Sequence, residues 1–122
     1  MRSEIETLKS WISDAHTAVF FGGAGVSTES GIPDFRSEDG LYHQKFDYPP
    51  ETIISHSFYA RNPSYFFRFY REKMLPLEAE PNVTHRVLAR LEQEGHLAAV
   101  VTQNIDGLHQ AAGSKTVYEL HG

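Results

Sequence analysis

The sequence contains no cysteine, little positive charge and no long apolar run, and each absence narrows the possible functions. Without cysteine, neither a disulfide framework nor a thiolate zinc site can form within these 122 residues. Lys and Arg number 11 against 16 Asp and Glu, a net charge of −5, which argues against a nucleic-acid-binding surface. No apolar stretch approaches the roughly 18 residues of a membrane span, and the polar first residues are unlike a secretory signal. We therefore expect no nucleic-acid or membrane partner and a cytoplasmic location.

The apolar residues that are present indicate alternating strands and helices. Apolar residues at helical spacing predict helices, and Asn82 and Gly95 are suitable as the cap and the stop of the second one. Short continuous apolar runs predict buried strands, the first of them central in a sheet. The expected elements are helices over residues 3–14, 82–95 and 107–112 and strands over 17–21, 97–102 and 116–120. This order predicts an α/β fold with a parallel sheet of about three strands and helices on both faces.

Two local patterns refine this expectation. The helix over 82–95 should bury the apolar face formed by Val83, Val87, Leu88 and Leu91. Residues 41–77 hold most of the aromatic side chains and differ in character from the rest, so we expect a small helical insertion there. The main domain then comprises residues 1–40 and 78–122.

A glycine-rich turn directly follows the first strand. Gly23 and Gly25 allow a tight turn and a close approach of the backbone to a phosphate. A helix beginning near Val26 would direct its free N–H groups at that phosphate. The third glycine of the dinucleotide-binding fingerprint is replaced by Thr28, so a turn without a ligand is an equal alternative for this segment alone.

The next loop carries an acid, an aromatic residue and an arginine after a proline. Arg36 could make a bidentate contact with a phosphate or carboxylate, and Phe35 could cover a flat ring. The alternative is a surface turn in which Asp34 and Arg36 are simply solvated.

Polar residues also follow the second and third strands. Ligands of open parallel sheets bind beyond the carboxyl ends of the strands, which favours a ligand-binding role for Gln103, Asn104 and Asp106. Alternatively, Asn104 or Asp106 caps the helix that begins near Gly107. His121 ends the third strand and is a candidate general base, although a lone histidine is more often structural. No two of the other histidines lie three or four positions apart, the spacing of a helical metal site, so we expect no metal ligands. We interpret them as structural or surface residues: His16, His43, His56, His85, His96 and His109.

The motifs GAGVSTESGIPDFR, TQNIDGLH and ELHG together resemble the sirtuin family, in its order and spacing. The resemblance implies a Rossmann-like domain and a small domain with NAD bound between them. It also implies transfer of the acyl group of a modified lysine, in a protein or peptide, to ADP-ribose with release of nicotinamide. The expected function is therefore that of an NAD-dependent protein-lysine deacetylase.

The resemblance also assigns roles to individual residues. Phe35 shields the reactive ribose carbon and Arg36 contacts the phosphates, both from a mobile loop. Asn104 holds the nicotinamide ribose, Asp106 accepts a hydrogen bond from the carboxamide, and His121 is the base that activates a ribose hydroxyl. The residues that it places at the cofactor are Gly23, Ala24, Gly25, Ser27, Thr28, Asp34, Phe35, Arg36, Gln103, Asn104, Ile105, Asp106 and His121.

A full sirtuin is roughly twice as long as this sequence. The resemblance therefore implies that a paired-cysteine zinc ribbon and the later Rossmann strands belong to the whole protein, and that zinc binds there without ligands from this segment. We expect the isolated segment to be inactive and its half-sheet to expose apolar faces. Tyr65 and Arg68 have the spacing found in sirtuins that prefer acidic acyl groups, but lie earlier than the family register, which favours deacetylation.

Two other functions fit the same residues. One is a module that binds NAD or ADP-ribose without turnover, and the other is mono-ADP-ribosyl transfer to protein.

Overall fold

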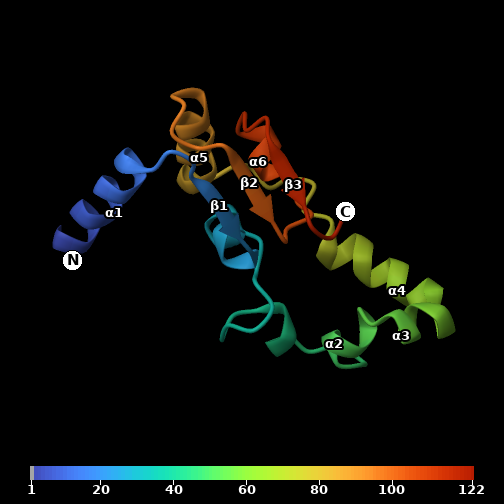
Figure 1. The fold of residues 1–122 in the computed structure, drawn as a ribbon. Coiled ribbons are helices and arrows are strands. Elements are labelled where there is room, and N and C mark those ends of the chain that lie inside the picture. Colours follow the sequence, from blue (N-terminus) through green and yellow to red (C-terminus); the bar gives the residue numbers. More distant parts are fainter. Residues whose placement is uncertain (1) are drawn as a thin grey trace.

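The computed structural model describes residues 2–122, and its elements follow the expected α/β order (Figure 1). In chain order they are α1 (Arg2–Asp14), β1 (Val19–Gly22), η1 (Ala24–Ser30), η2 (Leu41–His43), α2 (Pro50–Ile53), α3 (His56–Arg61), α4 (Pro63–Phe69), η3 (Tyr70–Met74), α5 (Val83–Gln93), β2 (Ala99–Thr102), α6 (Leu108–Ala111) and β3 (Val117–Glu119). The helices predicted over residues 3–14, 82–95 and 107–112 and the three predicted strands are present, with the strands shorter than expected. Over the part of the chain described, no helix is both long and apolar enough to cross a membrane.

The three strands form one parallel sheet in the order β1-β2-β3. Its last row pairs Gly22 with Thr102 and Thr102 with Glu119. Because all three strands run the same way, the segments that follow them leave the sheet at one edge. The glycine turn, the loop after β2 and His121 therefore begin side by side.

One face of the sheet carries the core of this part of the chain. Leu88 of α5 packs with Leu97 and Val100, and Phe20 and Val117 close the cluster from the neighbouring strands. α6 lies on the same face, since the His109 ring centroid is 6.3 Å from that of Phe20. These contacts fix the position of the loop between β2 and α6.

The opposite face is uncovered over its outer strands in the part of the chain described. Val19 and Phe21 are 54% and 61% exposed and Tyr118 is 58% exposed, and α1 extends away from the sheet (Figure 1). The expectation that the first strand is central and buried was wrong for this segment, because β1 forms the sheet edge. Local hydrophobicity shows that a strand is built for burial, but not which segment covers it.

The buried face of α5 also differs from the predicted one. Its buried residues include His85, Leu88 and Ala89, whereas Val83 and Val87 are half exposed. The cause lies in the first turn, where His85 Nδ1 accepts a hydrogen bond from the Asn82 N–H at 3.1 Å and so directs this histidine inward. The prediction is confirmed for Leu88 and for Leu91, which packs against the core, and it is wrong for Val83 and Val87.

A second, aromatic core holds the helical segment together. Leu41, Ile53, Phe58 and Phe69 are buried in it, and edge-on ring contacts such as that between Phe46 and Phe69 surround them. Figure 1 shows α2, α3 and α4 lying to one side of the sheet. The division into domains at residues 41 and 77 stays a prediction.

Candidate functional site

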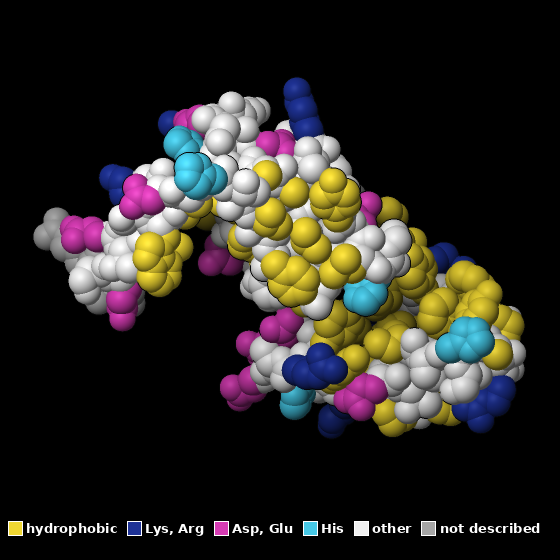
Figure 2. Space-filling model, in the orientation of Figure 1, with side chains coloured by type: hydrophobic (Ala, Val, Ile, Leu, Met, Phe, Trp, Pro, Cys, Tyr) yellow, Lys and Arg dark blue, Asp and Glu magenta, His cyan; other side chains and the backbone are white. Residues whose placement is uncertain are grey.

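A cavity of about 630 Å³ lies at the carboxyl edge of the sheet, beside the helical segment. Figure 2 shows the hollow between the sheet and the helical segment, with hydrophobic side chains along it. The expected residues on its wall are Ala24, Ser27, Asp34, Phe35, Arg36, Gln103, Asn104, Ile105, Asp106 and His121. Gly23, Gly25 and Thr28 are not on the wall. The helical segment adds residues that sequence reasoning missed, because no local spacing links them to the motifs: Leu41, Tyr42, Ile54, Lys73 and Met74.

The glycine turn does not open into the expected α-helix. Residues Ala24–Ser30 form a 3-10 helix, and the Val26 N–H donates to the Gly23 carbonyl at 3.1 Å. Thr28 Oγ1 donates to the Gly25 carbonyl at 3.0 Å, a local side-chain bond that competes with α-helical pairing. The prediction that the N–H groups from Val26 onward are free to bind a phosphate was therefore wrong for Val26, whose N–H is already hydrogen-bonded. The turn instead positions Ser27, which is buried.

Asn104 ties the loop after β2 to the glycine turn. Its Nδ2 donates to the Gly23 carbonyl at 2.9 Å and approaches Ser27 Oγ at 3.4 Å. Its own N–H donates to Thr102 Oγ1 at 2.9 Å, which fixes the backbone at the strand end. Both side-chain N–H groups are therefore directed at the turn. The Asn104 Oδ1 accepts no hydrogen bond from the described residues and is the atom available to a ligand.

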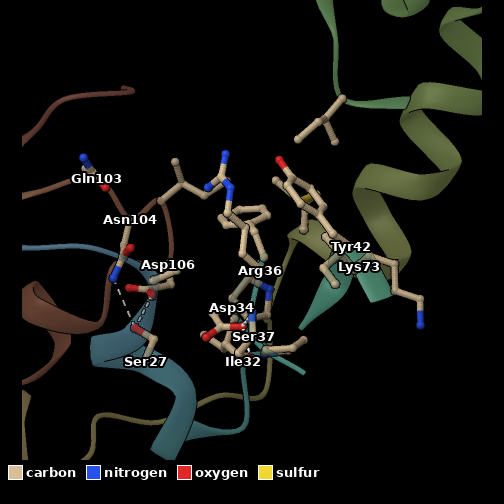
Figure 3. Close-up of a pocket in the computed structure, with 18 of the residues that line it drawn as sticks. Ser27, Ile32, Asp34, Arg36, Ser37, Tyr42, Lys73, Gln103, Asn104 and Asp106 are labelled. Carbon is tan, nitrogen blue, oxygen red and sulfur yellow. Dashed lines mark hydrogen bonds between the residues drawn. The ribbon is translucent and has the colours of Figure 1, made fainter. Parts of the chain in front are cut away.

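Asp106 combines the two roles that the sequence left open. Its Oδ1 accepts the Leu108 N–H at 3.0 Å at the start of α6, and its Oδ2 accepts the Ser27 hydroxyl at 2.6 Å. Figure 3 shows Asn104 and Asp106 turned toward Ser27 on one wall of the cavity. Because each carboxylate oxygen can accept more than one hydrogen bond, Asp106 keeps capacity for a ligand N–H.

The loop after the glycine turn is closed on itself. Leu41 N–H donates to the Asp34 carbonyl at 2.6 Å and Tyr42 N–H to the Phe35 carbonyl at 2.8 Å. The Ser37 hydroxyl and N–H both donate to Asp34 Oδ1. The Asp34 carboxylate thus holds the loop in shape, which the surface-turn alternative did not include.

Arg36 stands on the cavity wall opposite Asn104 and Asp106 (Figure 3). Its guanidinium carbon lies 5.4 Å from the centre of the Tyr42 ring, within the range of a cation–π contact. A histidine ring nitrogen, Nε2 of His43, lies 3.2 Å from the Arg36 carbonyl oxygen. No ion pair to the guanidinium is described among residues 2–122, so its donors are available to an anion.

The closed loop depends on the absence of a side chain at Gly40. A Cβ there would lie 2.8 Å from the backbone carbon and oxygen of Phe35, too close for either to stay in place. We expect Gly40→Ala to displace Phe35 and Arg36 and to raise the Kd of the whole protein for NAD about tenfold, since overpacking costs about 1–3 kcal/mol. Calorimetric titration with NAD measures this. The neighbouring Asp39→Ala, which removes no described hydrogen bond, should bind NAD normally; an unchanged Kd in Gly40→Ala would contradict the expectation.

His121 lies in the turn directly after β3 and reaches the cavity wall. The Leu120 N–H donates to the Thr102 carbonyl at 2.9 Å, which holds this turn against the end of β2. The side chain is exposed, so its imidazole is accessible to a ligand. The structure therefore brings together His121, Asn104 and the glycine turn, as the sequence predicted.

The site fits a nucleotide better than a metal ion. Over residues 2–122 no group of three or more His, Cys, Asp or Glu is arranged to hold a metal. The cavity wall instead offers the cation of Arg36, the amide of Asn104, the carboxylate of Asp106 and the apolar surface of Phe35 and Ile105. A nucleotide combines phosphates, ribose hydroxyls and a flat ring in one ligand, and these groups suit the cation, the polar side chains and the apolar surface of the wall. A parallel sheet with such a site at its carboxyl edge belongs to the class of open α/β proteins, which bind their ligands there.

Comparison with known proteins identifies the family within that class. The Sir2 family model matches residues 23–122, and the chain belongs to this family, the sirtuins. It is 60% identical over 121 residues to the NAD-dependent protein deacetylase of Clostridium acetobutylicum, covering 98% of this chain and 49% of that protein. It is 49% identical over 122 residues to NAD-dependent protein deacylase 2 of Archaeoglobus fulgidus, covering 100% and 47%. The chain thus spans about half the length of the curated relatives it matches.

Solved structures agree with this assignment. A structure from a study of the mechanism and regulation of Sir2 enzymes superposes with a TM-score of 0.90 at 48% identity, covering 100% of this chain and 47% of that one. A Sir2 complex with a p53 peptide and NAD⁺ superposes with a TM-score of 0.82 at 44% identity, covering 97% and 45%. The fold is therefore part of the Rossmann-like Sir2 fold, as expected.

Proposed function

We propose that the whole protein containing this segment is an NAD-dependent protein-lysine deacetylase, and that the segment carries the nicotinamide-ribose side of its active site. One observation carries the proposal: Asn104, Asp106 and His121, from the ends of two adjacent strands, line one cavity with Arg36. The Clostridium acetobutylicum relative at 60% identity is an NAD-dependent protein deacetylase, which supports the same activity here.

The residues of the cavity divide the binding of NAD among them. Arg36 pairs with the phosphates, for which its guanidinium is suited. The Asn104 Oδ1 accepts a hydrogen bond from a hydroxyl of the nicotinamide ribose, because its Nδ2 is already engaged by the Gly23 carbonyl. Asp106 accepts the N–H of the nicotinamide carboxamide while keeping its bond from Ser27. Ile105, beside it on the wall, packs against the nicotinamide ring.

The reaction then requires that water is excluded from the reacting ribose carbon and that a base removes the proton of a ribose hydroxyl. Bound NAD would supply the bond between nicotinamide and ribose that breaks, and the acyl carbonyl oxygen of the substrate would form the new bond to that ribose carbon. Phe35, on the cavity wall in the closed loop, keeps water from that carbon. His121 takes the proton of a ribose hydroxyl, the role of general base that histidine side chains fill most often.

The acyl group that fits best is acetyl. The Arg68 guanidinium lies 4.7 Å from the centre of the Tyr65 ring, in a contact between neighbours on one helix. Neither residue is on the cavity wall, whose residues from this part of the chain include Lys73 and Met74. An acidic acyl group would therefore find no arginine of the Tyr-x-x-Arg pair in the cavity.

The proposal also includes a structural zinc ion and a cytoplasmic location. The zinc would be held by cysteines outside this cysteine-free segment. The whole protein would act on acyl-lysine proteins in the cytoplasm. Metal analysis of the purified whole protein tests the zinc, and a zinc-free active protein would remove it from the proposal.

The test of function is nicotinamide release by the whole protein. We expect release with NAD and an acetyl-lysine peptide in equal amounts to deacetylated peptide, little with a succinyl-lysine peptide, and none with an unmodified peptide. NAD binding without release in any of these mixtures would instead identify a binding module. Label from NAD left on protein would identify ADP-ribosyl transfer. Either result would overturn the proposal.

A further inference from the structure

The strand that leads to His121 is held at its start by a carboxylate from α5. Glu92 Oε1 accepts the Lys115 N–H at 2.7 Å, and Oε2 accepts the Thr116 N–H at 2.9 Å. The backbone N–H groups of Lys115 and then of Thr116 lower the pKa of the Glu92 carboxyl, so it accepts both bonds in its charged form. Both oxygens of one side chain therefore bind the backbone directly before β3.

β3 pairs with one neighbouring strand in the part of the chain described. It is three residues long and lies at the sheet edge, beside β2. At its start the Thr116 carbonyl accepts the Val100 N–H at 2.9 Å, and after its end the Leu120 N–H donates to the Thr102 carbonyl at 2.9 Å. The Thr116 N–H, however, donates to Glu92. Glu92 thus connects the start of the strand to a second element, α5.

α5 is a firm support for this contact. Leu88, one turn before Glu92, is buried in the core on the sheet. The turn that precedes β3 lies close to the same helix, since a Cβ on Gly113 would be 4.0 Å from the Ala89 Cβ. The position of α5 therefore fixes the start of β3.

The other end of β3 leads into the cavity. Leu120 alone separates the strand from His121, whose side chain lies on the cavity wall with no described hydrogen bond of its own. An extended strand rises about 3.3 Å per residue, close to the full reach of the chain. It cannot take up a shift of its start, so such a shift reaches His121. A misplacement of about 1 Å in a reacting group costs up to about a hundredfold in rate.

We propose that Glu92 is a positioning residue for His121: by anchoring the start of β3 to α5, it fixes where the imidazole stands against the ribose hydroxyl. This inference rests on the proposed function for the role of His121. Glu92 itself is not on the cavity wall, so it touches neither NAD nor peptide. Its loss should lower kcat, and should change the Kd for NAD by no more than the loss of the His121 side chain does.

Two substitutions remove the anchor in steps. Glu92→Gln keeps the length of the side chain but turns one of its two acceptors into a donor, and Glu92→Ala removes both acceptors. We expect the kcat of the whole protein to fall about threefold in the first and about tenfold in the second. Steady-state kinetics with acetyl-lysine peptide measure the change, with rates counted per NAD-binding site from calorimetric titration.

Glu94→Ala is the matched control. Glu94 follows α5 directly and pairs with Arg90 of that helix at 2.9 Å. Its variant should therefore keep the wild-type kcat. Wild-type kcat in Glu92→Ala, or an equal loss in Glu94→Ala, would overturn the inference.

A double variant separates positioning from support of the fold. If Glu92 acts through the imidazole, its removal costs nothing further once His121 is alanine, and the double variant deacetylates at the rate of His121→Ala. If Glu92 only supports the fold, the tenfold loss recurs in the His121→Ala background, and that result would overturn the inference. Mass spectrometry of the deacetylated peptide at high protein concentration measures these slow rates.

The outcomes also separate this inference from the proposed function. Additive losses in a protein that deacetylates peptide end the inference alone. A wild-type protein that does not deacetylate peptide ends the proposed function, and with it the role of His121 on which the inference rests. If Glu92→Ala does not fold, Glu92→Gln takes its place in the double variant; if neither folds, Glu92 supports the fold itself and the inference is overturned.

Discussion

Replacing His121 with alanine is expected to lower the deacetylation rate of the whole protein by about 10²–10⁴, the usual contribution of a general base. The side chain is exposed at the cavity wall and makes no described hydrogen bond that supports the fold. Folding should therefore be nearly unchanged, NAD affinity should fall by no more than the loss of one hydrogen bond to a ribose hydroxyl, and most of the loss should appear in kcat. Steady-state kinetics with acetyl-lysine peptide, together with calorimetric NAD titration, measure the two effects separately.

His96→Ala is the matched control for this substitution. His96 is also exposed, but it lies after the end of α5 and away from the cavity wall. Its variant should deacetylate at the wild-type rate. Wild-type turnover by His121→Ala would show that another group serves as the base.

Asn104→Asp is expected to reduce kcat/KM for NAD about a hundredfold, because a buried donor or acceptor that loses its partner costs about 1–3 kcal/mol. The substitution keeps the shape of the side chain and removes both N–H donors. The Gly23 carbonyl, 2.9 Å from Nδ2, would then face a carboxylate oxygen, and Ser27 would lie between two carboxylates. Initial rates at varied NAD concentrations measure the change.

The same substitution at Asn62 is the control. Asn62 caps α4 by accepting the Tyr65 N–H at 3.3 Å, and a carboxylate accepts that bond equally well. Asn62→Asp should therefore retain wild-type kinetics. If Asn104→Asp behaved like Asn62→Asp, the amide donors of Asn104 would have no part in shaping the site.

The elements of the fold could be predicted because each has a local cause. Continuous apolar runs identified the strands, and Asn82 and Gly95 marked the ends of α5. Burial could not be predicted in the same way, since it depends on which segment covers a face. Phe21 and Val19 look like core residues in sequence and are exposed in the described part of the chain.

The site was predictable where its residues lie in motifs at strand ends. Parallel strands place their carboxyl ends together, so the glycine turn, Asn104 and His121 could be expected to meet. The residues that pack behind these site residues do not lie at a strand end, so the sequence does not reveal them. His85 and His109 are 24 positions apart, and their rings meet only because α5 and α6 pack on one face of the sheet.

The central claim is that the three segments surround one nicotinamide ribose. A crystal structure of the whole protein with NAD and an acetyl-lysine peptide tests it most directly. We predict a ribose hydroxyl within hydrogen-bond distance of both Asn104 and His121, with the carboxamide at Asp106. A ribose bound away from the loop of residues 103–106, or a His121 ring turned out of the cavity, would contradict it.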